Sequence, residues 1–252
     1  MRTVLATRYV TPLREGGSLP GLVEADDDGL YVVKFRGAGQ GVKALVAELV
    51  AGAIATAIGL PVPELVLVEL DPALGRAEPD SEVRELVTAS GGANVGIDFL
   101  PGAFDFAPGR PDGVPASFAA DVVWFDALVT NVDRTPRNPN LLVWHRRTWL
   151  IDHGAALYQH HAAALFAPRA REPFPMIAEH VLLPIAEPIA RADERLAARV
   201  DDAVIDGALA GVPDAWLGER PEERRGEYGE WLRARLAPPR PFVAEAERAR
   251  VA

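Results

Sequence analysis

The amino-acid sequence predicts an α+β fold of two lobes, with a small antiparallel sheet and one helix in the N-terminal third and a mainly helical remainder. Two observations support this prediction. Short apolar and β-branched runs, separated by turns rich in Gly and Asp, fill the first 36 residues, a pattern typical of strands. From residue 119 onward apolar residues recur at helical spacing, with Pro between the segments. We therefore divide the chain into residues 1–100 and 101–252.

The composition indicates a folded, soluble protein. Its 252 residues suffice for one large domain or two lobes, and 49% hydrophobic with 25% charged residues is ordinary for globular chains. The net charge of −10 argues against general nucleic-acid binding, which requires a basic face. The chain has no cysteine, so disulfides and cysteine-ligated zinc are excluded. No apolar run is long enough to span a bilayer and no signal-like N-terminus precedes the first strand, so we expect a cytoplasmic protein without a transmembrane segment.

In the N-terminal lobe we expect five strands and one helix. The strands are predicted at residues 4–10, 22–24, 30–35, 65–70 and 85–88. Residues 16–21 and 26–29 suit hairpin turns, because Gly and Asp tolerate positive φ. The helix is predicted over residues 42–58, since Gly59 and Pro61 follow it as stop signals.

In the C-terminal lobe we expect mainly helices around one short hairpin. Residues 96–115, with several Gly and Pro, are predicted to cross between the lobes. An apolar helix starts near residue 119, and a polar break at residues 131–140 follows it. Short strands are predicted near residues 141–144 and 148–151, and amphipathic helices punctuated by Pro from residue 182 to the end.

Lys34 is a candidate for binding phosphate. It is one of only two lysines and lies inside an apolar strand, where a cation needs a partner to offset its desolvation. Glu48, in the following helix, is the natural partner. Protein kinases hold the nucleotide phosphates with a strand Lys paired to a helix Glu, in this same order of elements. The alternative is that Lys34 reaches solvent from an edge strand and Glu48 is solvated.

Asp133, Asn138 and Asp152 have the spacing of a phosphoryl-transfer site. Asp133 and Asn138 lie five residues apart in a polar loop between an apolar helix and a strand, which is the D-x-x-x-x-N spacing of kinase catalytic loops. Asp152 ends the next hairpin with Gly154 close behind, as the magnesium-binding aspartate of kinases does. These groups supply hard oxygen ligands for Mg²⁺ and a carboxylate near the attacking hydroxyl. The alternative is that all three cap turns.

With these motifs in place, the chain resembles the HipA-like kinases, which share a protein-kinase-like fold with the phosphatidylinositol kinases. The resemblance spans about residues 5–200 and rests on residues 31–35, 47–51, 57–63, 131–138 and 150–154. It implies a two-lobed, kinase-like fold that binds ATP and Mg²⁺ between the lobes. In such an enzyme Lys34 would hold the phosphates, with Glu48 as its partner. Asp133 would be the catalytic base, and Asn138 with Asp152 would bind the metal.

The nucleotide contacts that the resemblance implies lie in a Gly-rich turn and in a hinge segment. They are Gly16, Gly17, Ser18, Asp98, Phe99 and Leu100. The chain lacks the G-x-G-x-x-G loop of ordinary protein kinases, so the turn at residues 16–21 is predicted to cover the phosphates, with an ordinary hairpin as the alternative. It also has Asn-Val-Asp and Asp-His-Gly where those kinases carry His-Arg-Asp and Asp-Phe-Gly.

Two classes of function follow from these residues. The first is an ATP- and Mg²⁺-dependent phosphotransferase with an alcohol group as acceptor. The family suggests Ser or Thr of a protein substrate, and a lipid or small-molecule hydroxyl is the alternative. The second class is a pseudokinase, which binds nucleotide or a partner without transferring phosphate. The complete set of Lys, Glu, Asp, Asn and Asp argues for the first class.

Overall fold

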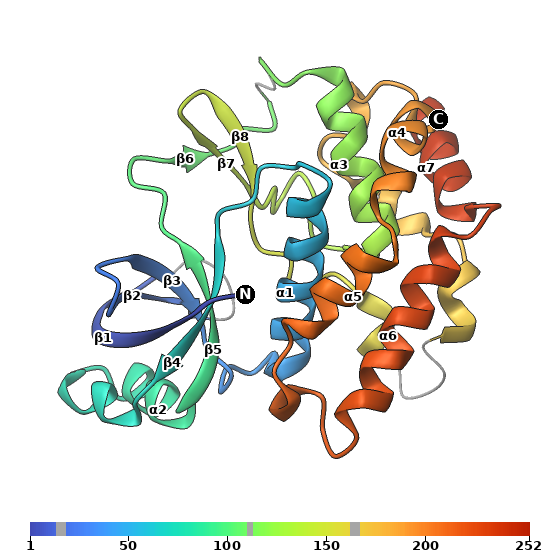
Figure 1. Cartoon of the computed structure of the whole chain (residues 1–252). Coiled ribbons are helices and arrows are strands. Elements are labelled where there is room, and N and C mark those ends of the chain that lie inside the picture. Colours follow the sequence, from blue (N-terminus) through green and yellow to red (C-terminus); the bar gives the residue numbers. More distant parts are fainter. Residues whose placement is uncertain (14–18, 110–112, 162–166) are drawn as a thin grey trace.

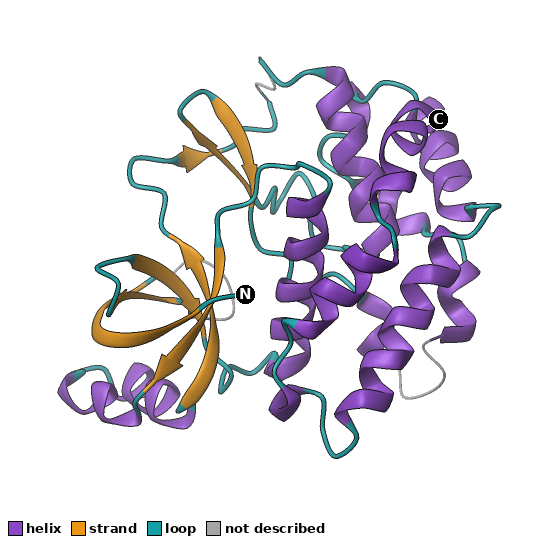
Figure 2. Ribbon diagram, viewed as in Figure 1, coloured by secondary structure: helices purple, strands orange, loops and turns teal. Residues whose placement is uncertain are grey.

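The computed structural model describes residues 1–13, 19–109, 113–161 and 167–252. In this part of the chain there are seven α-helices, a five-stranded sheet and a three-stranded sheet, so the predicted α+β class is confirmed. Figure 1 shows the strands on one side of the molecule and most helices on the other, with α1 (Gly41–Ala57) between them. Colouring by secondary structure makes the same division visible (Figure 2).

The N-terminal sheet closes into a barrel with the strand order β1-β2-β3-β5-β4. Its strands are β1 (Thr3–Pro12), β2 (Gly21–Ala25), β3 (Leu30–Lys34), β4 (Leu65–Leu70) and β5 (Gly92–Asp98). The first four strands match the prediction. The sheet is not wholly antiparallel, because β1 and β4 close the barrel as a parallel pair. A long connection through α1 separates these two strands, as parallel pairing requires.

The interior of the barrel is filled by residues that alternate along its strands. Val23, Tyr31, Val33, Val66 and Val68 are all nearly inaccessible to solvent and belong to one apolar cluster. Alternation of this kind places every second side chain on the inner face of a strand. The burial of these residues therefore explains why the period-two pattern of the sequence identifies the strands correctly.

Residues 85–88 are helical, so the strand predicted there was wrong. They belong to α2 (Ser81–Ala89), whose N-terminus is capped by Asp80, since its Oδ1 accepts the N–H of Glu82 at 3.0 Å. Val83 and Val87, four residues apart, form the buried face of α2 and pack on the barrel. A short run of apolar and β-branched residues hid this helical period. The fifth strand is β5, part of which had been assigned to the connection between lobes.

Helix α1 ends as its sequence predicts. The N–H of Gly59 donates to Thr56 at 3.0 Å and the N–H of Leu60 donates to Ala55 at 3.0 Å, while Gly59 has a φ of +87°. This is the hydrogen-bond pattern of a Schellman motif, which needs a residue without a Cβ at its left-handed position. The buried side chains of α1 join the larger apolar core of the molecule, which includes the helices from residue 116 onward.

The remaining helices pack around α3 (Ala116–Val129), whose side chains from residue 119 are almost all buried. They are α4 (Ile189–Leu196), α5 (Asp202–Ala210), α6 (Pro221–Leu236) and α7 (Pro241–Val251). The second sheet is antiparallel and contains β6 (Phe104–Asp105), β7 (Leu141–Trp144) and β8 (Arg147–Leu150). Within the described ranges, no helix has the length and apolar character needed to cross a membrane.

Arg235 of α6 fastens the C-terminal end of α3. Its buried guanidinium donates to the carbonyl groups of Ala127 and Leu128, at 2.6 and 2.7 Å. It also donates to Ala170 and Glu172, at 2.9 and 3.0 Å. A cation is favourable there, because the carbonyl groups at a helix C-terminus carry partial negative charge. Arg235 thus fixes the point where α3 passes into the polar loop of residues 131–140.

Candidate functional site

Strand β3 and helix α1 bring Lys34 and Glu48 into contact. Lys34 Nζ lies 2.5 Å from Glu48 Oε2 and 2.5 Å from Asp152 Oδ1, although Asp152 is 118 residues further along the chain. The side chain of Glu48 is 1% exposed and that of Lys34 is 12% exposed. Neither group is solvated, so the three side chains form one ionic cluster between the barrel and the helical part.

Lys34 and Glu48, the two most buried members of this cluster, are both charged. Burial lowers the pKa of Lys34, but attraction to Glu48 and Asp152 outweighs it and the net shift is upward. Burial raises the pKa of Glu48, but Lys34 and His153 outweigh that effect and hold this pKa well below its usual range. His153 contributes because its Nδ1 lies 3.5 Å from Glu48 Oε1, in a fully buried position beside Phe125.

The loop between α3 and β7 gathers two asparagine amides around Asp133. Asn138 Nδ2 donates to Asp133 Oδ2 at 2.8 Å. Asn140 Nδ2 donates to the backbone carbonyl of Asp133 at 3.3 Å and lies 3.4 Å from Oδ2. The N–H of Asp133 donates to Asn131 Oδ1 at 3.1 Å. These contacts fix the direction of the Asp133 carboxylate, while the residue stays only half-buried.

Three residues around this loop adopt left-handed backbone conformations. Thr130 at the end of α3 has a φ of +52°, Asn140 before β7 has +49°, and Asp152 after β8 has +55°. Thr130 is the least expected of the three, because a β-branched residue is crowded in this region. Strained backbone of this kind persists where the surrounding structure holds it and concentrates at functional sites.

A buried network of ion pairs and hydrogen bonds connects the loop at residues 131–140 to α3. Asp126 of α3 accepts from Arg134 Nε at 2.6 Å and from Asn131 Nδ2 at 3.0 Å. His180 Nε2 lies 2.9 Å from the same carboxylate. The side chains of Asp126 and Arg134 are inaccessible to solvent and that of His180 is nearly so. The network therefore links α3, the loop and the segment that carries His180.

The protonation states of this network follow from its contacts. Burial lowers the pKa of His180, and the nearby Asp126 offsets only part of that shift. His180 Nδ1 accepts the N–H of Leu182 at 3.1 Å, so the remaining proton of the neutral ring lies on Nε2 and points to Asp126. Burial raises the pKa of Asp126, but Arg134 and His180 reverse that shift and keep the pKa well below its usual range.

Arg134 also joins the loop to the β7–β8 hairpin. Its Nη1 donates to the carbonyl of Asn140 and, at 3.3 Å, to that of Ile151. The N–H of Ile151 donates to the carbonyl of Asn140 at 3.1 Å, directly beyond the paired residues Leu141 and Leu150. Asn140 and Asp152 are therefore held at neighbouring positions on the hairpin, whereas Asn138 is exposed in the loop.

The carboxylate of Asp152 and the amide oxygens of Asn138 and Asn140 are suited to binding a magnesium ion. Carboxylate and amide oxygens are the protein ligands that Mg²⁺ prefers, and it usually takes only one or two carboxylates together with phosphate oxygens and water. The side chain of Asp152 is 41% exposed, Asn140 lies at a neighbouring position on the hairpin, and Asn138 lies in the loop before it. Over the described ranges no cluster of three or more His, Asp or Glu side chains forms a closed metal cage. A solvent-accessible site with only two protein ligands agrees with the way in which proteins bind Mg²⁺.

The predicted nucleotide contacts are only partly visible. Gly16, Gly17 and Ser18 lie outside the described residues, in the connection from β1 to β2. In the hinge segment, the N–H of Asp98 donates to Glu64 at 2.9 Å and that of Phe99 donates to Leu30 at 2.9 Å. These two N–H groups are thus engaged within the protein.

Asp98 and Leu100 line a cavity of about 600 Å³ together with Trp144 and Trp149. None of Lys34, Glu48 and Asp152 lines this cavity. Burial and the nearby Glu64 raise the pKa of Asp98. These two hinge side chains therefore line a cavity to which the ionic cluster does not contribute.

Sequence reasoning missed the residues that position the loop. Asp126 is an acid in an otherwise apolar helix, and Arg134 directly follows Asp133, so both carry a local signal of a buried ion pair. Asn140 immediately precedes a strand, which is a second candidate position for an amide ligand. His180 carries no such signal, because its partner Asp126 lies 54 residues away.

Comparison with known proteins finds matches to a protein family and to the fold of a solved structure. A family model described as HipA-like kinase matches residues 7–228. Among solved structures, the crystal structure of a Helicobacter pylori proinflammatory kinase, CtkA, is similar with a TM-score of 0.61. The two sequences are 14% identical, and the match covers 99% of this chain and 98% of that chain, so it shows likeness of fold alone. No curated protein matches the chain.

Proposed function

The chain belongs to the HipA-like kinase family, and from that premise we propose that it transfers the γ-phosphate of ATP to a hydroxyl group, with Ser or Thr of a protein as the acceptor. The observation that carries the proposal is the cluster of Lys34, Glu48 and Asp152, in which one cation lies 2.5 Å from each of two carboxylates. A buried cation next to a half-exposed carboxylate is suited to phosphate on one side and metal on the other.

In this proposal Lys34 binds the α and β phosphates and Glu48 holds its ammonium in place. Glu48 stays ionised beside Lys34, so the ammonium keeps a fixed partner when Asp152 turns toward another ligand. Oriented cations at developing negative charge are among the largest contributions to catalysis. The nearly complete burial of Glu48 makes this positioning rigid.

Asp133 accepts the proton of the acceptor hydroxyl or orients that hydroxyl for attack. The two amide groups of Asn138 and Asn140 hold its carboxylate, and the half-buried position leaves it within reach of a substrate. A general base must lie within hydrogen-bond distance of the proton it takes, and a fixed carboxylate meets this requirement. The buried network of Asp126 and Arg134 keeps the loop that carries Asp133 in this arrangement.

Asp152 and an asparagine of the loop would hold magnesium, which neutralises charge on the transferring phosphate when bound. The spacing in the sequence favours Asn138 as the second ligand. The hairpin geometry favours Asn140, because its backbone is bonded to Ile151, next to Asp152. Comparing Asn138→Ala with Asn140→Ala separates the two. The ligand variant will require more Mg²⁺ for half-maximal activity, and the other variant will keep the wild-type requirement.

We further propose that the barrel and the helical part act as the two lobes of a kinase, with a boundary near residue 100 and the nucleotide between them. Residues 16–18 and the hinge at residues 98–100 are then the proposed contacts of phosphate and adenine. Helix α1 belongs to both parts, because it carries Glu48 and also packs in the helical core.

Purified protein incubated with labelled ATP and Mg²⁺, beside an Asp133→Asn variant, tests the proposal. Transfer of label to the protein or to an added Ser/Thr substrate by the wild type, and not by the variant, is the expected result. A wild type that transfers no label but melts at a higher temperature with Mg²⁺-ATP supports the pseudokinase alternative. Absence of any ATP binding contradicts both. A lipid substrate that accepts label in place of protein selects the lipid-kinase alternative.

A further inference from the structure

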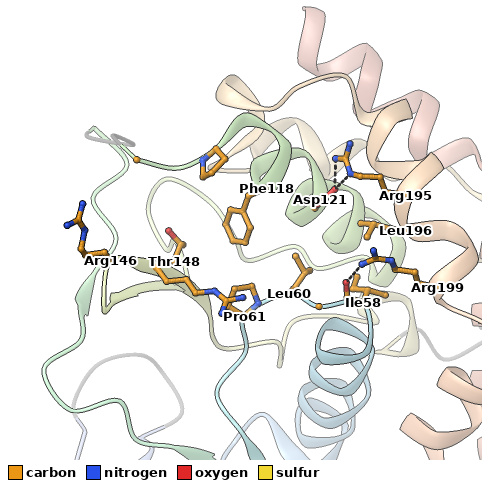
Figure 3. A pocket seen from close by; sticks show the side chains of 14 residues that line it. Ile58, Leu60, Pro61, Phe118, Asp121, Arg146, Thr148, Arg195, Leu196 and Arg199 are labelled. Carbon is orange, nitrogen blue, oxygen red and sulfur yellow. Dashed lines mark hydrogen bonds and ion pairs between the residues drawn. The ribbon is translucent and has the colours of Figure 1, made fainter.

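A separate cavity of about 420 Å³ lies between the C-terminal end of α1, the start of α3, the tip of the β7–β8 hairpin and the end of α4. Its volume falls in the range of pockets that take small ligands. Figure 3 shows Phe118 and Leu60 in its middle, with Leu196 between Arg195 and Arg199 on one side and Arg146 at the opposite margin. None of Lys34, Glu48, Asp133, Asn138 and Asp152 lines it.

Four arginines and one aspartate line this cavity, in a protein whose net charge is −10. Arg195 is already neutralised, because it pairs with Asp121 at 2.7 Å and with Glu187 at 2.7 Å. Arg199 donates to the carbonyl of Ile58 at 3.0 Å and forms no direct ion pair in the described ranges, and its charge acts on Asp121 at longer range. Four arginines, set against Asp121 in the lining and the neighbouring Glu187, leave an excess of positive charge in the cavity.

The two arginines at the tip of the β7–β8 hairpin also lack a carboxylate partner among the described residues. Arg146 and Arg147 form no ion pair with a carboxylate in the described ranges, and Arg147 instead stacks 5.6 Å from the ring centre of Trp149. His145 and Arg146 occupy the two-residue turn with φ values of +48° and +63°. Gly or Asn usually takes such positions, so the hairpin keeps a strained turn at the point that presents these arginines.

The middle of the cavity is apolar, which limits the class of ligand. Leu60 and Pro61 follow the end of α1, Phe118 belongs to the first turn of α3 and Leu196 ends α4. A ligand that fills this space needs an apolar or aromatic portion beside its anionic group. Guanidinium groups match phosphate oxygens well, and the excess of positive charge suits a dianion better than a single carboxylate.

We propose that this cavity binds an organic phosphate, with the phosphate on the arginine rim and the apolar portion against Phe118 and Leu60. The site is distinct from the proposed catalytic site but shares structural elements with it. The N–H of Leu150, two residues before Asp152, donates to the carbonyl of Pro61 in the cavity wall at 2.8 Å. Binding here is independent of whether the chain transfers phosphate.

Calorimetric titration of a Lys34→Met protein with phenyl phosphate, in the absence of Mg²⁺, tests the proposal. The Lys34→Met background removes the ammonium that would bind phosphate in the proposed nucleotide site, so the remaining phosphate binding reports on the cavity. We expect one saturable site. Inorganic phosphate should bind more weakly because it lacks the ring, and benzoate should bind more weakly because it carries one charge.

Arginine variants in the same background locate the site. Either Arg199→Gln or the double change of Arg146→Gln with Arg147→Gln at the opposite margin should weaken phenyl phosphate binding by roughly tenfold or more, since the phosphate loses a charged hydrogen bond on the margin where it lies. Arg220→Gln is the matched control, because Arg220 is exposed and pairs with Glu223 outside the cavity. Melting temperatures measured without ligand show whether each variant folds. If Arg199→Gln destabilises α1, the double variant of the exposed Arg146 and Arg147 still provides the test.

Three results overturn the proposal. One is the absence of saturable binding at millimolar phenyl phosphate. Another is unchanged affinity in the arginine variants, or an equal loss in Arg220→Gln. The third is an affinity for benzoate or for inorganic phosphate equal to that for phenyl phosphate. Equal binding of benzoate would show that the phosphate is not recognised, and equal binding of inorganic phosphate would show that the organic portion is not recognised.

Discussion

Two buried ionic groups flank the proposed catalytic loop, and they differ in how far they are closed to solvent. In the first, Lys34 joins Glu48 and Asp152, and the exposed fraction of the side chain rises from 1% at Glu48 to 41% at Asp152. In the second, Asp126 and Arg134 are both 0% exposed. The first group is thus open at one end, whereas the second is enclosed by protein.

The difference indicates which group can exchange partners. Removing one member of an enclosed ion pair leaves an uncompensated buried charge, which is strongly unfavourable. The enclosed group therefore holds the loop in one arrangement. At the open end, water, metal or phosphate can replace a protein partner of Asp152 at a much smaller free-energy difference. The open group is the one suited to ligand binding.

The largest expected effect comes from breaking the enclosed group. Asp126→Ala leaves Arg134 buried without its carboxylate, so we expect a loss of about 3–5 kcal/mol in the free energy of unfolding. Urea denaturation followed by circular dichroism measures it. Asp121→Ala on the same helix is the matched control, because Asp121 pairs with a partly exposed Arg195 and should lose only about 1 kcal/mol or less. Equal losses in the two variants would contradict the comparison.

Removing the cation of the open group should act on the reaction more than on the fold. We expect Lys34→Met to lower the phosphoryl-transfer rate by roughly 10²–10³-fold, because an oriented charge at the phosphates is lost. Its stability should fall less than that of Asp126→Ala, since Glu48 can take up a proton once Lys34 no longer lowers its pKa. Steady-state kinetics with labelled ATP measures the rate. Lys43→Met is the control, and a rate retained by Lys34→Met contradicts the assignment.

Acid should weaken the enclosed group through His180. Its pKa is lowered by burial, with Asp126 opposing and Arg134 reinforcing the shift, so the folded protein keeps the ring neutral. Below about pH 6.5 the unfolded chain binds a proton that the folded chain does not, and the free energy of unfolding falls as the pH falls. His160, whose pKa burial lowers to about 3, acts in the same direction.

The check is urea denaturation at about pH 7.5 and about pH 5.5, on either side of the pKa of an unperturbed histidine. His180→Gln should lose less stability than the wild type between the two conditions, while the exposed His145→Gln should behave as the wild type does. An unchanged pH dependence in His180→Gln would show that folding does not shift the pKa of His180, and a steeper loss than in the wild type would show that the folded ring is protonated.

The smallest expected effect on stability is that of Asp152→Asn. Because the Asp152 side chain is partly exposed, we expect a change of at most about 1 kcal/mol in the free energy of unfolding. Phosphoryl transfer should nevertheless be lost, since the amide lacks the negative charge of the carboxylate that we propose to bind the metal. Thermal denaturation and the labelling assay separate the two effects. A large loss of stability would mean that this end of the cluster is as closed as the other.

Local patterns in the sequence account for most of the strands and helices. Period-two alternation identifies the strands from Thr3 to Leu70, and Gly59 with Pro61 marks the end of α1. The pattern fails at α2, where a short β-branched run conceals the helical spacing of Val83 and Val87. A window of four residues contains too few positions to distinguish the two periods.

The candidate site is predictable to a similar extent. Lys34, Asp133 and Asp152 stand out because each places a charge beside an apolar element in an order typical of phosphoryl-transfer enzymes. For the amide ligand, the D-x-x-x-x-N spacing predicts Asn138. The hydrogen bond from Ile151 to Asn140 favours Asn140 instead, and the sequence does not reveal that bond.

The sequence by itself therefore determined the kinds of chemical group, their order along the chain and the local elements that carry them, because these depend on interactions between near neighbours. The sequence also predicted the pair of Lys34 and Glu48, but the tertiary structure alone decided which charges meet across longer separations. Lys34 contacts Asp152 across 118 residues and His180 contacts Asp126 across 54 residues. Such pairings depend on how the whole core packs. No local period encodes that packing, and it also determines which ionic group is open to a ligand and which one is enclosed.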